Sequence, residues 1–394
     1  MSLAFLGGQP AFDQPLAVGM PAVEPATRER YLALMGEVFD RNWLTNDGPL
    51  VRRLEAEVAR LHAVDHCVLV CNATIAQMLV LRALELTGAV VVPSFTFVAT
   101  AHACRMEGLD PVFCDVSPTT LMAGPEEVER ALTPATRSVV PVHLFGNVCD
   151  VAGLEQLAAR RSLALVFDAA HAFACFAGDV PVGRFGRAEI LSFHATKAFS
   201  TFEGGAVLTN DASLDARLRH LRNFGFRGYD DVAWLGLNGK MSEAQAAFGL
   251  ASLPELEARR ARGRAVYDAY RRALADVPGV RVLPVGEQGV SNHHYVPVLL
   301  DPPAFGLSRD RLYRVLWAEN VLARRYFHPG VHRMDAYAPA KGGPPPLPVT
   351  EDVSARILCL PAGFARPDET VERVVAVVRE ARAEAPAIRR KAEA

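Results

Sequence analysis

Lys197 lies in an uncharged run, SFHATKAFSTF, between two strand-like segments. A lysine can form a Schiff base with a carbonyl cofactor when its amine is neutral, and burial promotes the neutral form. Asp168 ends the apolar run LALVF upstream, and the glycines Gly204 and Gly205 follow the lysine. Pyridoxal phosphate (PLP) requires this set: an amine, an acid that faces the ring nitrogen, and a pocket for the phosphate. The pattern predicts a PLP site.

Asp168 is expected at the carboxyl edge of a parallel sheet, the edge where open α/β folds bind their ligands. There a carboxylate keeps the pyridine nitrogen protonated, so that the ring can accept electrons from a substrate carbanion. His171 is three residues further on and could donate to the phenolic oxygen of the cofactor. Taken singly, an aspartate here is more often a helix cap, and a lone histidine is more often structural. The prediction therefore depends on the combination of residues.

The phosphate of the cofactor needs backbone amides at the start of a helix and hydroxyl donors. Asn72, Ala73 and Thr74 offer them where the strand HCVLVC turns into a helix, and Ser192 precedes Lys197 on its strand. Phe97, in PSFTFVAT, could stack on one face of the cofactor ring. Its ordinary role would be that of a core aromatic, so this assignment depends on that of the lysine.

Apolar strands and amphipathic helices alternate along most of the chain, which predicts a largely parallel sheet with helices on both faces. The segment VRRLEAEVARLHA has helical spacing, and Asn72 or Thr74 could cap the helix NATIAQMLVLRALEL. The predicted strands are HCVLVC, AVVVPSF, DPVFCDV, SVVPVHLF, LALVFDAA, ILSFHAT and GAVLTND, and further helices are FVATAHACRMEG, PEEVERALT and VAGLEQLAARR.

Beyond about Leu250 the sequence changes character, because LPELEARRARGRAVYDAYRRALADV is a long charged amphipathic helix. We expect it to connect a large domain, residues 1–250 with the N-terminal arm, to a small α/β domain, residues 251–394. The small domain should contain the strand HHYVPVLL, the helix RDRLYRVLWAENV, a proline-rich surface loop and a final helix from about Pro367. The tail after Glu384 is expected to fray.

The composition of the chain restricts the kinds of molecule that it could bind. The chain has 394 residues and a formal net charge of −2, which gives no overall attraction to nucleic acid or to an acidic membrane. Its seven cysteines are scattered, without the paired spacing of a zinc site, and they fit buried thiols in a reducing compartment. The apolar opening lacks a basic leader, and no apolar run approaches the roughly twenty residues that span a bilayer. We expect no metal and a cytoplasmic protein.

Ordered motifs along nearly the whole chain resemble those of the DegT/StrS family of PLP-dependent nucleotide-sugar aminotransferases. The resemblance implies the fold of type I PLP-dependent transferases, which is like that of aspartate aminotransferase, with a large domain built on a mostly parallel mixed sheet. The motifs are FLGGQPAF, NWLTNDGPLVRRLEAEVA, PSFTFVATAHA, PVHLFGNVCD, FDAAHAFA, SFHATKAFSTFEGGAVLTND, LNGKMSEAQAAFGLASL and ILCLPAG.

The resemblance also implies a role for each candidate. Lys197 would be the Schiff-base lysine and catalytic base, Asp168 the acid at the ring nitrogen, and His171 the partner of the phenolate. Asn238, in GLNGKMSE, matches an asparagine that crosses the interface of a homodimer to the neighbour's phosphate. Phosphate donors would be Ala73, Thr74 and Ser192, and Phe97 would stack on the ring.

Three positions depart from the family pattern. The usual Ser-Gly-Thr of the phosphate turn is Asn72-Ala73-Thr74 here, so the turn must tolerate a Cβ atom. Many relatives have glutamine in place of His171. The usual Asn-Tyr-Arg-Met is Asn238-Gly239-Lys240-Met241, so any contact of the arginine with a substrate anion would fall to a lysine.

The segment SFHATKAFSTFEGG resembles that of enzymes that aminate C4 of dTDP-4-keto-6-deoxyhexoses, and YFHPGVH points the same way. The resemblance implies transfer of an amino group from L-glutamate to C4 of dTDP-4-keto-6-deoxy-D-glucose, which gives dTDP-4-amino-4,6-dideoxy-D-glucose for antibiotic sugars.

Alternatives remain at this point. A C3 aminotransferase of a 3-ketosugar nucleotide is the nearest, whereas the C3 dehydrases replace the lysine with histidine. A sugar-nucleotide sensor without catalysis would have no use for the lysine, the aspartate and the phosphate residues. A cysteine-dependent PLP enzyme would need Cys149 or Cys175 as a nucleophile.

Overall fold

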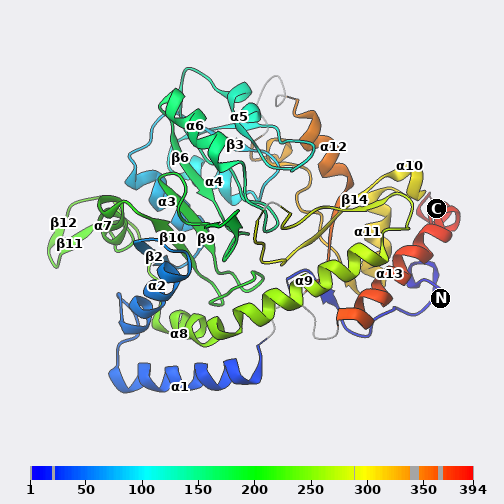
Figure 1. Cartoon of the computed structure of the whole chain (residues 1–394), viewed down its shortest axis with the longest axis horizontal. Coiled ribbons are helices and arrows are strands. Elements are labelled where there is room, and N and C mark those ends of the chain that lie inside the picture. Colours follow the sequence, from blue (N-terminus) through cyan, green and yellow to red (C-terminus); the bar gives the residue numbers. More distant parts are fainter. Residues whose placement is uncertain (1, 20–22, 288, 338–345, 363–366, 394) are drawn as a thin grey trace.

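A seven-stranded sheet forms the centre of the protein (Figure 1). The structure is a computed structural model, and it describes all residues except 1, 20–22, 288, 338–345, 363–366 and 394. Every strand predicted for the first part of the chain is present in this sheet. In spatial order the strands are β2 (His66–Val70), β10 (Gly205–Thr209), β9 (Ala188–Ser192), β6 (Ala164–Asp168), β5 (Thr136–Val139), β3 (Ala89–Pro93) and β4 (Asp110–Cys114).

The sheet is mixed because one strand runs against the others. β10 pairs antiparallel with β2 and with β9, whereas the pairs from β9 to β4 are all parallel. The strands β2, β9, β6, β5, β3 and β4 therefore all point the same way. Their carboxyl ends lie along one edge, and the predicted α/β fold with a mostly parallel mixed sheet is confirmed.

Helices cover both faces of this sheet, which explains why strands such as β3 and β10 are buried at every position rather than at every second one. Val68 and Val70 of β2 pack with residues of α3, α4 and α7, whereas Cys67 and Leu69 of the same strand pack with α2 and α8. The helices of this part are α1 (Pro25–Arg41), α2 (Pro49–Leu61), α3 (Ala73–Ala83), α4 (Ala99–Met106), α5 (Pro125–Ala131), α6 (Val151–Arg161), α7 (Ala212–Leu221) and α8 (Glu243–Ser252).

The long helix α9 (Leu256–Ala273) runs from beside α8 to a second, three-stranded sheet (Figure 1). This sheet consists of β13 (Val280–Val282), β14 (Val296–Leu300) and β16 (Ile357–Leu360), all antiparallel. It packs with the N-terminal residues Leu3 and Phe12 in one hydrophobic cluster. The helices here are α10 (Pro302–Phe305), α11 (Arg309–Ala318), α12 (Pro348–Arg356), α13 (Pro367–Ala383) and α14 (Ala385–Glu393).

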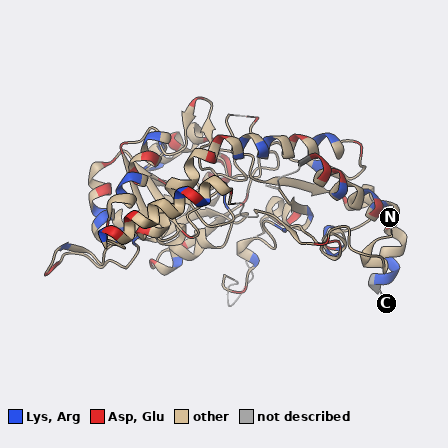
Figure 2. Cartoon of the chain, turned by 90° about the horizontal axis from the view of Figure 1, so that it is seen from below, with Lys and Arg blue, Asp and Glu red and all other residues tan. Residues whose placement is uncertain are grey.

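Three two-stranded sheets and three 3₁₀ helices complete the described part of the chain. The pairs are β1 (Leu16–Ala17) with β15 (Val321–Leu322), β7 (Phe176–Ala177) with β8 (Val180–Pro181), and β11 (Phe226–Gly228) with β12 (Asp231–Val232). Figure 2 shows the last pair as an arm that projects from the end of the molecule opposite to the two termini. The 3₁₀ helices are η1 (Ala4–Leu6), η2 (Leu253–Glu255) and η3 (Val331–Arg333).

The expectation that the tail after Glu384 frays was wrong. Residues from Ala385 form the helix α14, and Ile388 on it is fully buried in the core that α9, α11 and α13 share. Alanine and arginine are good helix formers, and Ala385 and Ile388 on the inner face pack into that core.

Two other expectations concern the second half of the chain. Most of the proline-rich loop, residues 338–345, lies outside the described residues; Leu347 beyond it is buried, and Pro348 begins α12. The division into domains at residue 250 stays a prediction. Within the described residues, no helix is both long and apolar enough to cross a membrane.

Candidate active site

The predicted site residues meet in a cavity of about 550 Å³ at the carboxyl edge of the large sheet. Asp168 ends β6 and Ser192 ends β9, while Asn72 and Phe97 follow β2 and β3. Every predicted site residue except Asn238 lines this cavity. A larger cavity, of about 670 Å³, is lined by residues such as Thr120 and Pro284 and by none of the predicted set.

Three donors hold the buried carboxylate of Asp168. Gln77 Nε2 and Thr100 Oγ1 donate to its Oδ2 at 2.6 and 2.8 Å, and the amide of Ala170 donates to Oδ1 at 3.1 Å. An oxygen has two lone pairs, so Oδ1 retains one that no donor among the described residues uses.

Lys197 carries the amine of the site on the turn after β9. Burial lowers the pKa of this amine to about 8, although the nearby Asp168 carboxylate favours the charged form and opposes the shift. Lys197 Nζ donates to Tyr295 Oη at 3.3 Å and lies 5.9 Å from the centre of the Tyr295 ring. An amine with this pKa is partly neutral near physiological pH and can act as a nucleophile or base.

His171 is buried and neutral. Burial, and next the positive charge of Lys197, hold the pKa of this imidazole well below its usual value. The amide of Phe145 donates to Nδ1 at 3.3 Å. Because Nδ1 accepts, the proton of the neutral ring must be on Nε2, which is then a donor. The ring packs against Tyr295, with the ring centres 4.5 Å apart.

The first turn of α3 presents unused amides to the cavity. Asn72 caps this helix as predicted, because its side chain accepts a hydrogen bond from the amide of Ile75. No group among the described residues accepts from the amides of Ala73 and Thr74. Ala73 is not among the residues with a positive φ, so its Cβ atom fits this turn without backbone strain. A Cβ atom on Gly205 would lie 2.7 Å from the nitrogen of Ala73, so glycine lets β10 approach this turn closely.

Phe97 and Asn238 differ from the buried members of the set. Phe97 lines the cavity, but its side chain is exposed. Asn238 is exposed and lies outside the cavity lining of its own chain. Lys240, two residues further on, donates to Asn223 Oδ1 at 2.9 Å and is 4.8 Å from the centre of the Phe224 ring, also outside the lining.

Comparison with known proteins shows the family of the chain. A sequence model described as the DegT/DnrJ/EryC1/StrS aminotransferase family matches residues 25–379. The chain belongs to this family. As an aminotransferase of the family it is an enzyme, and the resemblance seen in the sequence is confirmed.

Named relatives of this aminotransferase resemble it over most of their length. The dTDP-4-amino-4,6-dideoxy-D-glucose transaminase of Shigella dysenteriae is 36% identical over 93% of this chain and 99% of that protein. The Escherichia coli protein of the same name is 34% identical over 87% of this chain and 93% of its own length. The crystal structure of DesI in the presence of its TDP-sugar product is 45% identical, with a TM-score of 0.94, over 100% of this chain and 99% of that one.

Several residues that line the cavity or contact Asp168 were not predicted from the sequence of this aminotransferase. Gln77 lines the cavity from the interior of α3, and Thr100 contacts Asp168 from the first turn of α4. An ordinary amphipathic pattern conceals both. Tyr295, Arg324 and Tyr326 come from the C-terminal part and reach the cavity only through the tertiary fold. The uncommon cluster of histidines and a tyrosine in SNHHYVPV was a signal that could have indicated Tyr295.

Proposed function

We propose that this aminotransferase uses PLP to transfer the amino group of L-glutamate to C4 of dTDP-4-keto-6-deoxy-D-glucose, and so makes dTDP-4-amino-4,6-dideoxy-D-glucose. The observation that carries the proposal is the meeting of Lys197, Asp168 and the first turn of α3 in one cavity. The names of the Shigella and Escherichia relatives support the sugar and the position of the amine.

The residues fit the cofactor. Lys197 has an amine neutral enough to bind its aldehyde, and Asp168 Oδ1 has a lone pair for its ring nitrogen. The free amides of Ala73 and Thr74 at the positive end of a helix, together with Ser192, suit a phosphate. When bound, PLP supplies a carbonyl that takes up amino groups and a ring that stabilises negative charge on the substrate carbon.

Lys197 would then move the proton of the reaction. In our proposal its Nζ removes the proton from the α-carbon of glutamate, and in the second half of the cycle it returns a proton to C4 of the sugar. Tyr295 Oη accepts a hydrogen bond from this amine and so orients it. His171, with its proton on Nε2, would donate to the phenolic oxygen of the cofactor, and Asp168 would keep the ring nitrogen protonated.

Asn238 supports a homodimer with its active sites at the interface. Asn238 is exposed and does not line the cavity of its own chain, so its side chain is free to reach the phosphate site of a neighbouring chain. Large apolar side chains are also exposed around α1 and the loop after it, as expected of a surface covered by a partner. They include Leu32, Phe39, Trp43, Leu44 and Phe202.

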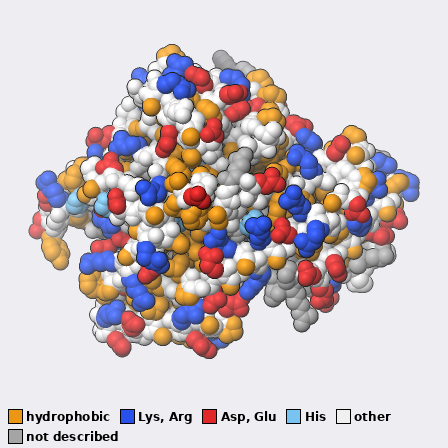
Figure 3. Space-filling model, in the orientation of Figure 1, with side chains coloured by type: hydrophobic (Ala, Val, Ile, Leu, Met, Phe, Trp, Pro, Cys, Tyr) orange, Lys and Arg blue, Asp and Glu red, His pale blue; other side chains and the backbone are white. Residues whose placement is uncertain are grey.

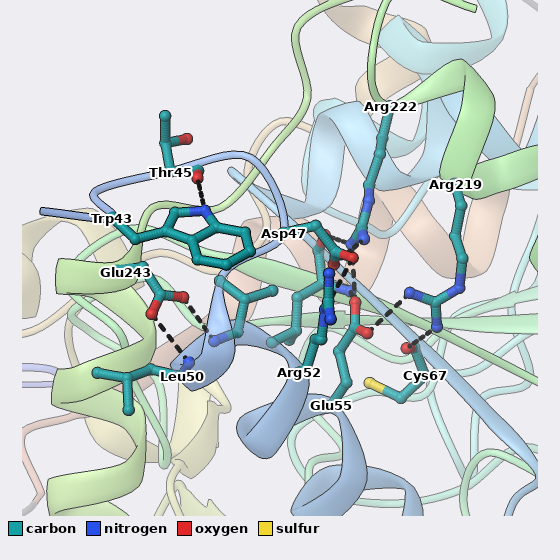
Figure 4. Close-up of polar contacts among 12 residues, drawn as sticks. Trp43, Thr45, Asp47, Leu50, Arg52, Glu55, Cys67, Arg219, Arg222 and Glu243 are labelled. Carbon is teal, nitrogen blue, oxygen red and sulfur yellow. Dashed lines mark hydrogen bonds and ion pairs between the residues drawn. The ribbon is translucent and has the colours of Figure 1, made fainter. Parts of the chain in front are cut away.

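An ion-pair network around the buried Arg222 connects the two segments that would form this interface (Figure 4). The Arg222 guanidinium lies between Asp47, at 2.8 Å, and Glu55, at 2.7 Å. The carbonyl of Arg222 accepts from the amide of Gly239, next to Asn238. One buried arginine thus fixes both the loop that carries Trp43 and the segment that carries Asn238.

The cysteines do not offer a competing nucleophile. Burial raises the pKa of the Cys175 thiol to about 12 and that of Cys149 above its usual range as well. Neither thiol lines the cavity of Lys197. All seven cysteines are free, which fits the cytoplasm that we propose as the location of the enzyme.

The proposal is tested by product analysis. Purified protein, PLP, L-glutamate and dTDP-4-keto-6-deoxy-D-glucose are incubated together, and the amine is located in the product by NMR. We expect it at C4. No amination of this sugar, together with amination at C3 of the 3-keto isomer in a parallel incubation, would establish the alternative regiochemistry instead. The Asp168→Asn variant should lose several orders of magnitude in rate, because a neutral amide no longer favours a protonated ring nitrogen.

A further inference from the structure

We infer that Arg324 binds an oxyanion of the substrates, either a carboxylate of the amino donor or the diphosphate of the nucleotide sugar. The inference rests on the proposed function, since it assigns a substrate-binding residue to the same cavity. Among lysines and arginines, Lys197 and Arg324 line this cavity. In the proposed function the amine of Lys197 binds the cofactor and transfers the proton, which leaves Arg324 to bind an anion.

The backbone of the segment after β15 directs Arg324 into the cavity. Side chains of an extended segment alternate between two sides. Val321 and Ala323 are fully buried in the C-terminal core, whereas Leu322, Arg324 and Tyr326 all line the cavity. Hydrogen bonds in both directions between the backbones of Arg324 and Cys359, at 3.0 and 2.7 Å, fix this register.

Charge distinguishes Arg324 from its neighbour. Arg325 forms an ion pair with Asp310 at 2.9 Å and lies 4.7 Å from the centre of the Tyr313 ring. Arg324 has no carboxylate within ion-pair distance among the described residues, and its guanidinium lies 5.3 Å from the centre of the Tyr326 ring. Its charge is therefore not neutralised by the chain.

The surroundings allow an anionic ligand to reach Arg324. This residue is exposed, and it lines the cavity together with Trp317, Leu322 and Phe327. Its guanidinium is therefore open to a ligand that enters the cavity. Its planar fork can bind two oxygens of a carboxylate or phosphate at once. Both proposed substrates have such groups at one end, away from the reacting carbon. Figure 3 shows basic and acidic side chains interspersed over one face of the outer surface.

Binding of unreactive ligands tests the inference. Glutarate represents the carboxylates and dTDP the diphosphate, and each is titrated calorimetrically into the PLP-loaded protein. For Arg324→Gln we expect a loss of about tenfold or more in affinity for one of the two, as expected when a charge-assisted hydrogen-bond pair is lost. The ligand affected identifies the source of the oxyanion, and Arg324→Lys should recover part of the loss.

Arg325→Gln is the matched control, because it removes the same charge one residue away, outside the cavity. The control should bind both ligands within about twofold of the wild type, as expected for an exposed ion pair. Arg324→Gln protein should retain the absorbance of the lysine-bound cofactor and its unfolding temperature, which shows that it is folded.

Equal affinities of wild type and Arg324→Gln for both ligands, or no binding of either ligand by the wild type, would overturn the inference. Failure of the proposed function gives a different result: the wild type makes no 4-amino sugar, yet its affinity for glutarate or dTDP still depends on Arg324.

Discussion

Gln77 Nε2 lies 2.6 Å from Asp168 Oδ2, while Gln77 Oε1 is buried without a hydrogen-bond partner among the described residues. A buried amide that leaves its own acceptor unsatisfied in order to donate to a carboxylate costs stability. The arrangement is explained if the position of Asp168 is critical to the enzyme.

We therefore predict that Gln77→Leu lowers the turnover number by about tenfold, because Asp168 loses one of two donors to Oδ2. Steady-state assays of the PLP-loaded enzyme measure this. Gln156→Leu, on the exposed surface of α6, serves as the control and should be unchanged. A Gln77→Leu enzyme as active as that control would show that the hydrogen bond has no part in catalysis.

The pKa of about 8 at Lys197 predicts how PLP binding depends on pH. Only the neutral amine attacks the aldehyde, so the attachment rate should rise with pH and level off above about 8 rather than near 10.5. Stopped-flow absorbance of the cofactor-free protein mixed with PLP follows this step.

The Asp168→Asn variant tests the direction in which the charge of Asp168 shifts the pKa of Lys197. Because the Asp168 carboxylate favours charged Lys197, its loss should lower the pKa of the amine further and shift the attachment profile to lower pH. A shift to higher pH would contradict the assigned environment of the lysine.

Mixed dimers test whether Asn238 acts in the neighbour's site. Lys197→Ala and Asn238→Ala proteins are each expected to be nearly inactive. After unfolding and refolding together, half of the dimers are mixed, and each mixed dimer contains one intact site if Asn238 acts across the interface. Activity should then return to about a quarter of the wild-type value. If Asn238 acted within its own chain, mixing would restore nothing.

The helix α14 predicts a stability effect remote from the site. Ile388→Ala should lower the free energy of unfolding by about 2–5 kcal/mol, because it removes a fully buried side chain from the C-terminal core. Arg390→Ala, on the exposed side of the same helix, should change it by less than about 0.5 kcal/mol. Urea unfolding compares the two. Equal effects would mean that α14 does not pack as described.

The sequence was sufficient to predict the strands of the large sheet, because seven apolar runs, most of them separated by helices, permit few other arrangements. It was also sufficient to predict that Lys197 and Asp168 lie close together, because Asp168 ends one strand and Lys197 follows another, and the two strands meet at one edge of the sheet. It was insufficient for the contacts that depend on tertiary packing. Gln77 resembles any helical glutamine until α3 lies beside β6, and Arg324 resembles Arg325 until β15 fixes which side each faces.

At the C-terminal tail, the local sequence pattern led to a wrong prediction. Composition after Glu384 indicated a polar, fraying end, yet Ile388 belongs to a core whose other residues extend back along the chain as far as Leu3. Such a contact is invisible to local patterns, which report only what neighbouring residues prefer.

The most direct test of the account is to locate the PLP attachment site chemically. The chain has four lysines, Lys197, Lys240, Lys341 and Lys391, so the experiment discriminates well. Borohydride reduction of the PLP-loaded protein, followed by mass spectrometry of its peptides, should place the phosphopyridoxyl group on Lys197 alone, and Lys197→Arg protein should carry none. The group on Lys240 or another lysine, or on no peptide, would contradict the central claim that Lys197 and Asp168 form the catalytic centre.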